Sequence, residues 1–464
     1  MMNYREQIQL KAVPMPSFGY MPRQVVLSDE TMAERLGKVL ALMKKKQLDI
    51  LLVYADLEHG SNFEYLTGFL PRFEEAVLAL HQNGDAYMLM GNENTKMVNY
   101  ARIKAQLIHV PFFSLPNQPM EDDADMTQYL KTAGIEKGKR VGIAGWKNFT
   151  SRAMDNRYLF DLPYYIVDAV LRLVERENVV NACDVFIGTE DGARCVNNAN
   201  EIAHYAYGSA LSGEVVFDAI DAVREGIREC DIGSYLGKYG QNHSVVTIAA
   251  TGDRFDKANL YPSEKQVRLG DKISVTSGFK GGITSRAGYA VEQEEQLPDE
   301  AKTYIERLAK PYFGAVTAWI ENIRIGMTGG ELYELVEQVL PKADYHWFLN
   351  PGHLVADEEW MCSPVYPGSQ DVLKSGMLLQ IDMIPSVPGL GGTGCESGVA
   401  LADESLRADI KKQYPELYRV FQERRAYLAT VLGVQVPEWV LPLSDTVAYY
   451  RPFFLNREIA FVKK

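Results

Sequence analysis

The chain has 464 residues, of which 47% are hydrophobic and 23% charged, a composition typical of a globular protein with two or three domains. Its net charge of −13 leaves no basic surplus to neutralise phosphates, so we expect no nucleic-acid partner. Five cysteines without CxxC spacing indicate a reducing compartment, and no apolar run is long enough for a signal peptide or a membrane span. We therefore expect a cytoplasmic protein with no membrane partner.

Helix and strand patterns alternate through the first part of the chain. Thr31 and Glu34 have the spacing of a capping box, and apolar residues recur after Thr31 at helical intervals. Buried strands are predicted at residues 48–55, 76–80, 86–90 and 140–145. Strands separated by helical segments predict an α/β domain, which we place at residues 1–185.

The pattern changes after the polar stretch "GTEDGARCVNNANE". Helices are predicted at residues 198–225, 299–323, 329–341 and 415–433. Strands are predicted at residues 244–251, 270–278, 283–291, 345–350, 376–386 and 396–402. Helix pairs between antiparallel strands indicate an α+β domain, which we place at 186–433, followed by a C-terminal tail (434–464) packed on the body.

Three polar residues of catalytic type lie in or beside the predicted strands of the second domain. Asp382 lies in the apolar stretch "MLLQIDMIPS", where an unpaired carboxylate is costly. Glu396 follows the Gly-rich "PGLGGTGC", and His353 follows the aromatic segment "YHWFLNPG". Each residue alone has an ordinary explanation, such as a satisfied buried histidine or a carboxylate on an exposed strand face. The three together favour a site, although their spacing alone does not decide it.

Six short stretches resemble a known superfamily in their order and spacing. They are "SNFEYLTGF" (61–69), "NEIAHYAYGSALSGEVV" (200–216), "GDKISVTSG" (270–278), "NPGH" (350–353), "SGMLLQID" (375–382) and "GCESGVAL" (394–401). Together they span nearly the whole chain and resemble the creatinase and Xaa-Pro peptidase superfamily. The resemblance implies an α/β creatinase-type N-terminal domain and an α+β C-terminal domain with the pita-bread fold.

The same resemblance implies a position for each metal ligand. In the metallopeptidases of this superfamily two Asp, one His and two further carboxylates hold two divalent ions. His353, Asp382 and Glu396 match the last three of these positions. The first Asp position falls on Thr276, whose hydroxyl cannot replace an anionic oxygen ligand. We therefore expect no metal and no other cofactor.

The second Asp position has two alignments. It falls on Arg286 if "GITSRAGY" is aligned on Gly282 and Ser285, or on Ser285 itself after a slip of one residue. In the first case the guanidinium of Arg286 would neutralise the buried carboxylates of Asp382 and Glu396 in place of the metal. The alternative is that Arg286 points outward from a strand edge.

Creatinase, which resembles this chain in its Gly-rich loop "VPGLGGTGCES", works without metal and uses a histidine as acid and base. That histidine position falls here on Asn259, and a second histidine of the peptidases falls on Trp360. We expect both residues to contact the substrate. His353 then remains as the acid–base candidate, oriented by Asp382 or Glu396.

Four further residues are weaker candidates. His243 precedes a strand and is expected to be a loop or capping residue, and Tyr261 and Tyr289 are two of 26 tyrosines. Cys395 neighbours Glu396, but strand alternation places it on the opposite face, where packing is its expected role.

The N-terminal domain offers one more candidate. "TGFLPRFEE" places Arg72 just after the motif that, in creatinase-like dimers, reaches the site of the neighbouring subunit. Arg72 would clamp a substrate carboxylate there, or it is an ordinary exposed arginine. The resemblance implies a homodimer.

We interpret the chain as a metal-independent hydrolase that acts on a C–N bond of a small carboxylate-bearing amide or amidine. His353 would move the proton, Asp382 and Glu396 would anchor polar groups, and Arg286 and Arg72 would bind the anion. One alternative is a metal-dependent Xaa-Pro aminopeptidase or dipeptidase in which other residues replace the missing ligands. The other is a non-catalytic protein that binds a metabolite in the retained pocket.

Overall fold

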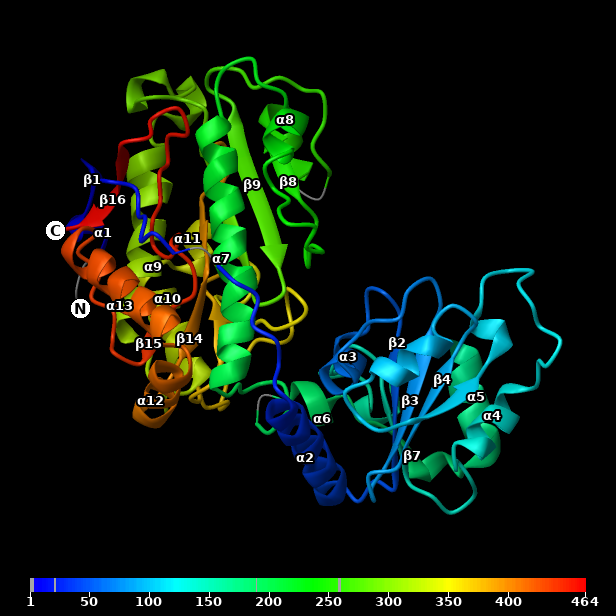
Figure 1. Cartoon of the computed structure of the whole chain (residues 1–464). Helices are drawn as coiled ribbons and strands as arrows, with labels where there is room; N and C mark the ends of the chain where they lie inside the picture. The colour runs from blue at the N-terminus through cyan, green and yellow to red at the C-terminus, as the bar shows by residue number, and fades with distance from the viewer. Residues whose placement is uncertain (1–3, 21, 189, 258–259) are drawn as a thin grey trace. The chain divides into compact units, whose positions relative to one another are not determined.

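The computed structural model describes residues 4–464 except 21, 189 and 258–259, and the chain forms two compact units (Figure 1). The N-terminal domain spans residues 27–195, and the C-terminal domain combines the stretch before residue 27 with residues 196–464. This division differs from the predicted one, which ended the first domain at 185 and set 434–464 apart as a tail. The reason is that β1 (Ile8–Ala12) pairs antiparallel with β16 (Ile459–Lys463).

The N-terminal domain is built on one mixed sheet with the strand order β5-β4-β3-β2-β6-β7. Its strands are β2 (Ile50–Ala55), β3 (Ala76–His81), β4 (Ala86–Met90), β5 (Gln106–His109), β6 (Val141–Ala144) and β7 (Val179–Asn181). Its α-helices are α2 (Asp29–Lys45), α3 (Ser61–Thr67), α4 (Met126–Thr132), α5 (Tyr164–Leu173) and α6 (Asp184–Ile187). The four predicted strands are confirmed. The unpredicted β5 and β7 are short and carry little of the apolar pattern that identifies a strand.

Helix α2 begins earlier than its sequence pattern predicted. The Ser28 side chain caps it by accepting a hydrogen bond from the Thr31 backbone N–H at 3.2 Å. Thr31 therefore lies inside the first turn, and the capping box expected between Thr31 and Glu34 is wrong.

The C-terminal domain contains two four-stranded antiparallel sheets, which confirms the α+β prediction. The first has the order β13-β10-β9-β8 and consists of β8 (Ile248–Thr251), β9 (Lys272–Phe279), β10 (Gly282–Tyr289) and β13 (Gly394–Glu396). The second has the order β11-β12-β14-β15 and consists of β11 (His353–Leu354), β12 (Leu378–Gln380), β14 (Gly398–Leu401) and β15 (Val440–Pro442). Because β13 and β14 are separated by Ser397 alone, the chain passes directly from one sheet to the other.

Helices cover these sheets. They are α1 (Tyr4–Gln7), α7 (Ala199–Ala222), α8 (Glu229–Gly233), α9 (Lys310–Asn322), α10 (Gly329–Val339), α11 (Lys342–Tyr345), α12 (Glu404–Gln413) and α13 (Pro415–Thr430). Helix α7 runs along β9 and β10, as Figure 1 shows for β9. The approach is close because a Cβ at Gly208 would lie 1.9 Å from the carbonyl oxygen of Lys280. None of the helices in the described part of the chain is both long and apolar enough to cross a membrane.

One predicted strand of this domain is wrong, and another is confirmed only in part. Residues 345–350 do not form a strand, because α11 ends at His346, which has a left-handed backbone with φ 53°. The strand predicted at 376–386 is limited to Leu378–Gln380. Beyond it the chain leaves the ladder, and Pro385 has no N–H with which to continue it. Asp382 therefore lies on an irregular segment rather than within a strand.

Glu229 fixes the start of α8 to β8 and to the segment that contains Ser263. Its buried carboxylate accepts hydrogen bonds from Thr251 N–H at 2.8 Å, Ser263 Oγ at 2.6 Å and Arg254 Nε at 2.8 Å. Burial by itself would raise the pKa of Glu229, but the bonds from Ser263, Thr251 and Arg254 bring that pKa below its ordinary value. The ionised form is thus stabilised by folding.

We predict that Glu229→Gln lowers the thermal midpoint at pH 7 by about 4–8 °C, as expected for a loss of about 2 kcal/mol in a domain of this size. Because the folded pKa is depressed, this stabilisation is complete above the unfolded pKa and is lost as pH falls through the folded value. The difference between variant and wild type should therefore shrink below about pH 4. Thermal scans against pH test this, with the exposed Glu225→Gln as control; equal effects of the two variants would contradict it.

Candidate functional site

A cavity of about 860 Å³ opens in the C-terminal domain. Strands β8, β9, β10 and β13 of the first sheet and β11 of the second contribute to its lining. The remaining lining comes from the segments 348–360 and 382–394, from residues 245–246 and 255–256, and from Tyr312 on α9. The site is therefore held by both sheets, and its polar residues come from segments far apart in the sequence.

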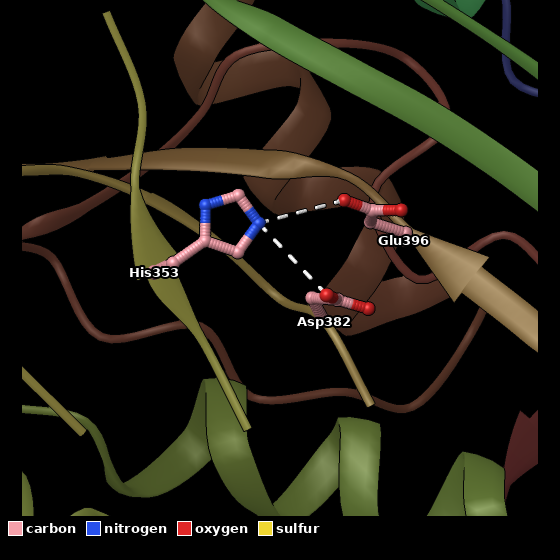
Figure 2. Close-up of side chains that lie close together, drawn as sticks. All are labelled: His353, Asp382 and Glu396. Carbon is pink, nitrogen blue, oxygen red and sulfur yellow. Dashed lines mark ion pairs between the residues drawn. The ribbon is translucent and has the colours of Figure 1, made fainter. Parts of the chain in front are cut away.

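His353, Asp382 and Glu396 meet in this cavity (Figure 2). His353 Nε2 lies 3.9 Å from Asp382 Oδ2 and 3.9 Å from Glu396 Oε1. One ligand-type atom of each residue lies within 4.8 Å of the other two. Figure 2 shows the imidazole and both carboxylates pointing toward one common space. The three residues that the sequence singled out thus form one cluster.

The tautomer of His353 follows from its second ring nitrogen. Nδ1 lies 3.2 Å from the carbonyl oxygen of Leu354, and a carbonyl can only accept. Nδ1 therefore carries the proton, which leaves a lone pair on Nε2 directed toward Asp382 and Glu396. A backbone carbonyl that orients a histidine in this way is the usual second partner of a metal-binding imidazole.

The carboxyl groups of the cavity hold protons more strongly than usual. Burial, then repulsion from Glu396, raises the pKa of Asp382 to about 7. Burial, then repulsion from Glu359, raises the pKa of Glu396 to about 8. Burial lowers the pKa of His353, more than the nearby Asp382 raises it. In the described part of the chain, no lysine or arginine forms an ion pair with Asp382 or Glu396.

Glu359 is a member of this site that sequence reasoning missed. It lines the cavity, and burial followed by the opposed effects of His353 and Asp382 raises its pKa to about 7. In the sequence it belongs to "ADEEW", which reads as an ordinary exposed charged turn. Its position six residues after His353 is the one signal that points to the site.

Arg286 does not neutralise the carboxylates, so this interpretation of the sequence is wrong. Its buried guanidinium donates to backbone carbonyls, including Glu396 at 2.7 Å, Tyr449 at 3.1 Å and Thr446, and to Ser397 Oγ at 3.2 Å. Alternation along β10 explains this, because Ser285 faces the cavity and the next residue must face away. Arg286 is a structural clamp behind β13, not an anion binder in the cavity.

Ser285 is the residue of β10 that lines the cavity beside Glu396. It is paired across the sheet with Thr276 on β9 and with Glu396 on β13. Thr276 and Ser285 both line the cavity, and their hydroxyl oxygens lie 2.6 Å apart. Because Ser285 rather than Arg286 lines the cavity, the geometry favours the alignment with the one-residue slip, in which two hydroxyls stand where the resemblance implies two carboxylates.

The other predicted contact residues have different outcomes. The Trp360 ring lines the cavity and lies over His353, with ring centroids 5.5 Å apart. Asn259 lies outside the described residues. Arg72 belongs to the N-terminal domain, where its backbone N–H donates to Asn94 Oδ1 at 3.2 Å and its side chain is exposed.

The weaker candidates lie away from the cluster. Cys395 is buried with its Sγ 3.8 Å from the Tyr449 carbonyl, on the face of β13 opposite Glu396, as predicted. His243 stacks on Phe279, and Tyr289 donates to the Leu390 carbonyl at 2.9 Å. Tyr261 is largely exposed. None of the four is among the residues that line the cavity in the described part of the chain.

Comparison with known proteins gives matches to both domains. Residues 203–403 match metallopeptidase family M24, and residues 35–158 match the creatinase/prolidase N-terminal domain. An Xaa-Pro dipeptidase of Pyrococcus furiosus is 24% identical over 228 residues, which cover 46% of this chain and 62% of that protein. An uncharacterized peptidase of Staphylococcus aureus is 19% identical over 257 residues, which cover 54% of this chain and 72% of the relative.

Solved structures show the same fold. A prolidase from Thermococcus sibiricus has a TM-score of 0.63 and 18% identity, covering 82% of this chain and 96% of that chain. A prolidase from Pyrococcus horikoshii has a TM-score of 0.60 and 17% identity, covering 80% of this chain and 95% of that chain. The architecture is that of a pita-bread domain with a creatinase-type N-terminal domain. The chain belongs to the creatinase and Xaa-Pro peptidase superfamily.

The donor set decides how many metal ions this site suits. Two ions would need anionic oxygens where Thr276 and Ser285 offer neutral hydroxyls that already bond to each other, so a two-ion centre does not fit. One ion does fit, because His353 Nε2, Asp382 and Glu396 converge and supply a nitrogen and two carboxylates.

We predict that the double variant Thr276→Asp/Ser285→Asp gains a second metal site. Without metal the new carboxylates lie beside Glu396 and repel it, so the thermal midpoint should fall below that of wild type. Added Mn²⁺ should then raise this midpoint more than it does for wild type, and metal content should increase by about one ion per chain.

The matched control is Thr276→Asn/Ser285→Asn, which has the same shape without the charge. A double Asp variant that behaves like this control in metal content and in its response to Mn²⁺ would contradict the assignment of Ser285.

Proposed function

We propose that this chain hydrolyses a peptide-type C–N bond with the help of one divalent metal ion held by His353, Asp382 and Glu396. The observation that carries the proposal is the convergence of these side chains within 4.8 Å in a buried pocket. The reaction class is supported by the relatives, among them the Xaa-Pro dipeptidase of Pyrococcus furiosus.

Each residue of the site has a distinct role in the proposed hydrolysis. A divalent ion in this cluster supplies Lewis acidity, which polarises a carbonyl and makes a water more acidic. His353 keeps its Nε2 lone pair available because Leu354 holds the proton on Nδ1. Glu359 lies outside the converging set yet lines the cavity, so it is the carboxyl placed to move a proton. Trp360 lies over His353 and keeps water from that side of the ring.

A second candidate is metal-independent hydrolysis of a C–N bond. The observation that favours it is that Thr276 and Ser285, which line the cavity, carry hydroxyls rather than carboxylates. His353 would then move the proton, with Asp382 and Glu396 to orient it. A carboxylate-bearing substrate was expected for this chemistry because Arg286 and Arg72 were predicted to bind its anion. Arg286 cannot do so, because it faces away from the cavity. If the chain binds a metabolite in this pocket but does not hydrolyse it, the protein is a non-catalytic metabolite-binding protein.

Metal content separates these functions. We predict about one divalent ion per chain by elemental analysis, and hydrolysis of an Xaa-Pro peptide that depends on this ion. His353→Ala and Glu396→Gln should each reduce occupancy at least tenfold, as expected for loss of a ligand. His346→Asn is the control, because His346 is exposed and Asn also adopts its left-handed backbone.

The other results each select another function. Two ions per chain would show that the site accepts a two-ion centre despite the hydroxyls of Thr276 and Ser285. Hydrolysis that survives full chelation would support the metal-independent candidate, and absence of both metal and hydrolysis would leave a binding protein.

We further propose that the protein is a homodimer in which the segment around Arg72 contacts the neighbouring subunit. Phe73 beside it is 73% exposed and has φ 69°, a left-handed backbone that a bulky residue adopts at a cost of about 1–3 kcal/mol. Such strain on an exposed aromatic supports a contact role for this segment.

Light scattering at micromolar concentration tests the dimer. We predict the mass of two chains for wild type and a weakened dimer for Phe73→Ala, with Tyr100→Ala as an equally exposed control in the same domain. A monomeric wild type would remove Arg72 from the site of a partner.

A further inference from the structure

The mouth of the cavity is apolar and exposed. Four large side chains that line it remain in contact with water, namely Phe348 (68% exposed), Trp360 (46%), Ile384 (44%) and Leu349 (43%). Scattered exposed apolar residues are normal, but a group of them around one cavity marks a ligand site, because a ligand removes their surface from water. The occupant of this mouth should therefore carry an apolar group.

The lining of the cavity is acidic. Asp256, Glu359, Asp382 and Glu396 line it, whereas Lys272 is the single permanently charged cation among its described lining residues. Lys272 already lies 3.5 Å from Asp256 and over the Phe255 ring at 5.7 Å. A divalent ion held by Asp382 and Glu396 would offset their charges and leave Glu359 without a paired cation among the described lining residues.

A carboxylate that enters this cavity would find no free partner among the described lining residues. Arg286 donates to carbonyl groups on the other side of β10, so its N–H groups are not available to a ligand in the cavity, although its charge opposes the rise in the pKa of Glu396. An anion there would lose its hydration without gaining a free cationic donor, which is unfavourable in a desolvated site. A neutral or cationic ligand avoids this cost.

We propose that the cavity is specific for neutral or cationic amides and peptides that present an apolar, preferably aromatic, group to Trp360 and Phe348. The bond to be cleaved has no free carboxylate beside it. The inference rests on the proposed function in taking this cavity as the place of hydrolysis. A volume of about 860 Å³ lies near the upper end for small-molecule sites, so the cavity has room for a peptide longer than a dipeptide.

Binding of three probes tests this on the full-length protein by calorimetry. They are N-acetylphenylalaninamide, N-acetylphenylalanine and N-acetylglycinamide, which separate the effect of the charge from the effect of the ring. We expect the phenylalaninamide to bind at least tenfold more tightly than either of the other two. Trp360→Ala should weaken its binding at least threefold and leave the glycinamide unchanged, and Tyr100→Ala should change neither.

Equal or tighter binding of N-acetylphenylalanine would overturn the proposal. Lys272→Gln and Arg72→Ala would then identify the cation, since the responsible variant loses that preference. Equal binding of the phenylalaninamide and the glycinamide would overturn the proposal that the apolar side chains at the mouth of the cavity bind the aromatic group of the ligand. These measurements need no turnover, so a protein that prefers the phenylalaninamide but contains no metal would contradict the proposed function and leave the specificity intact.

Discussion

The site depends on one electrostatic constraint, which is that several partly or fully buried carboxyl groups have no lysine or arginine paired with them in the described part of the chain. Asp382, Glu396 and Glu359 share one cavity with His353, while the donors of Arg286 are directed to backbone carbonyls behind the sheet. Such a group of acids is stable only if bound protons or a bound cation reduce its net charge. The raised pKa values of Asp382 and Glu396 describe the first solution, and the convergence of their oxygens on His353 Nε2 permits the second.

The alternation of side chains along β10 decides which of its residues faces the cavity that holds these carboxyl groups. Ser285 and Arg286 are neighbours on β10, so one must face the cavity and the other the layer behind it. Ser285 presents a hydroxyl rather than a carboxylate to the cavity, and the guanidinium of Arg286 outside it donates to the carbonyl of Glu396. A shift of one residue would have exchanged these roles and placed a cation among the acids. The chemistry of the pocket is thus decided by strand register.

Much of the fold could be predicted because the signals are local. The apolar runs that become β2, β3 and β9 have the length and pattern of buried strands, and the order of the motifs located His353, Asp382 and Glu396. The register of β10 could not be decided, because a hairpin of small residues aligns almost equally well one residue further on. Glu359 was not predicted as a site residue, because a charged turn has the same sequence pattern whether it faces water or a cavity. The domain ends differed because the partner of β1 lies more than 400 residues away in the sequence.

The pairing of β1 with β16 also has a consequence for how the protein is made. The N-terminal domain is inserted between two parts of the C-terminal domain, so residues 27–195 leave the ribosome long before β16 exists. The first domain can fold as it emerges, while β1 must wait as an unpaired strand until almost the whole chain has been translated. An unpaired strand edge readily joins the wrong partner. Nascent chains and truncated products are therefore most vulnerable to aggregation at their first strand, and the domain that carries the site is the last to be completed.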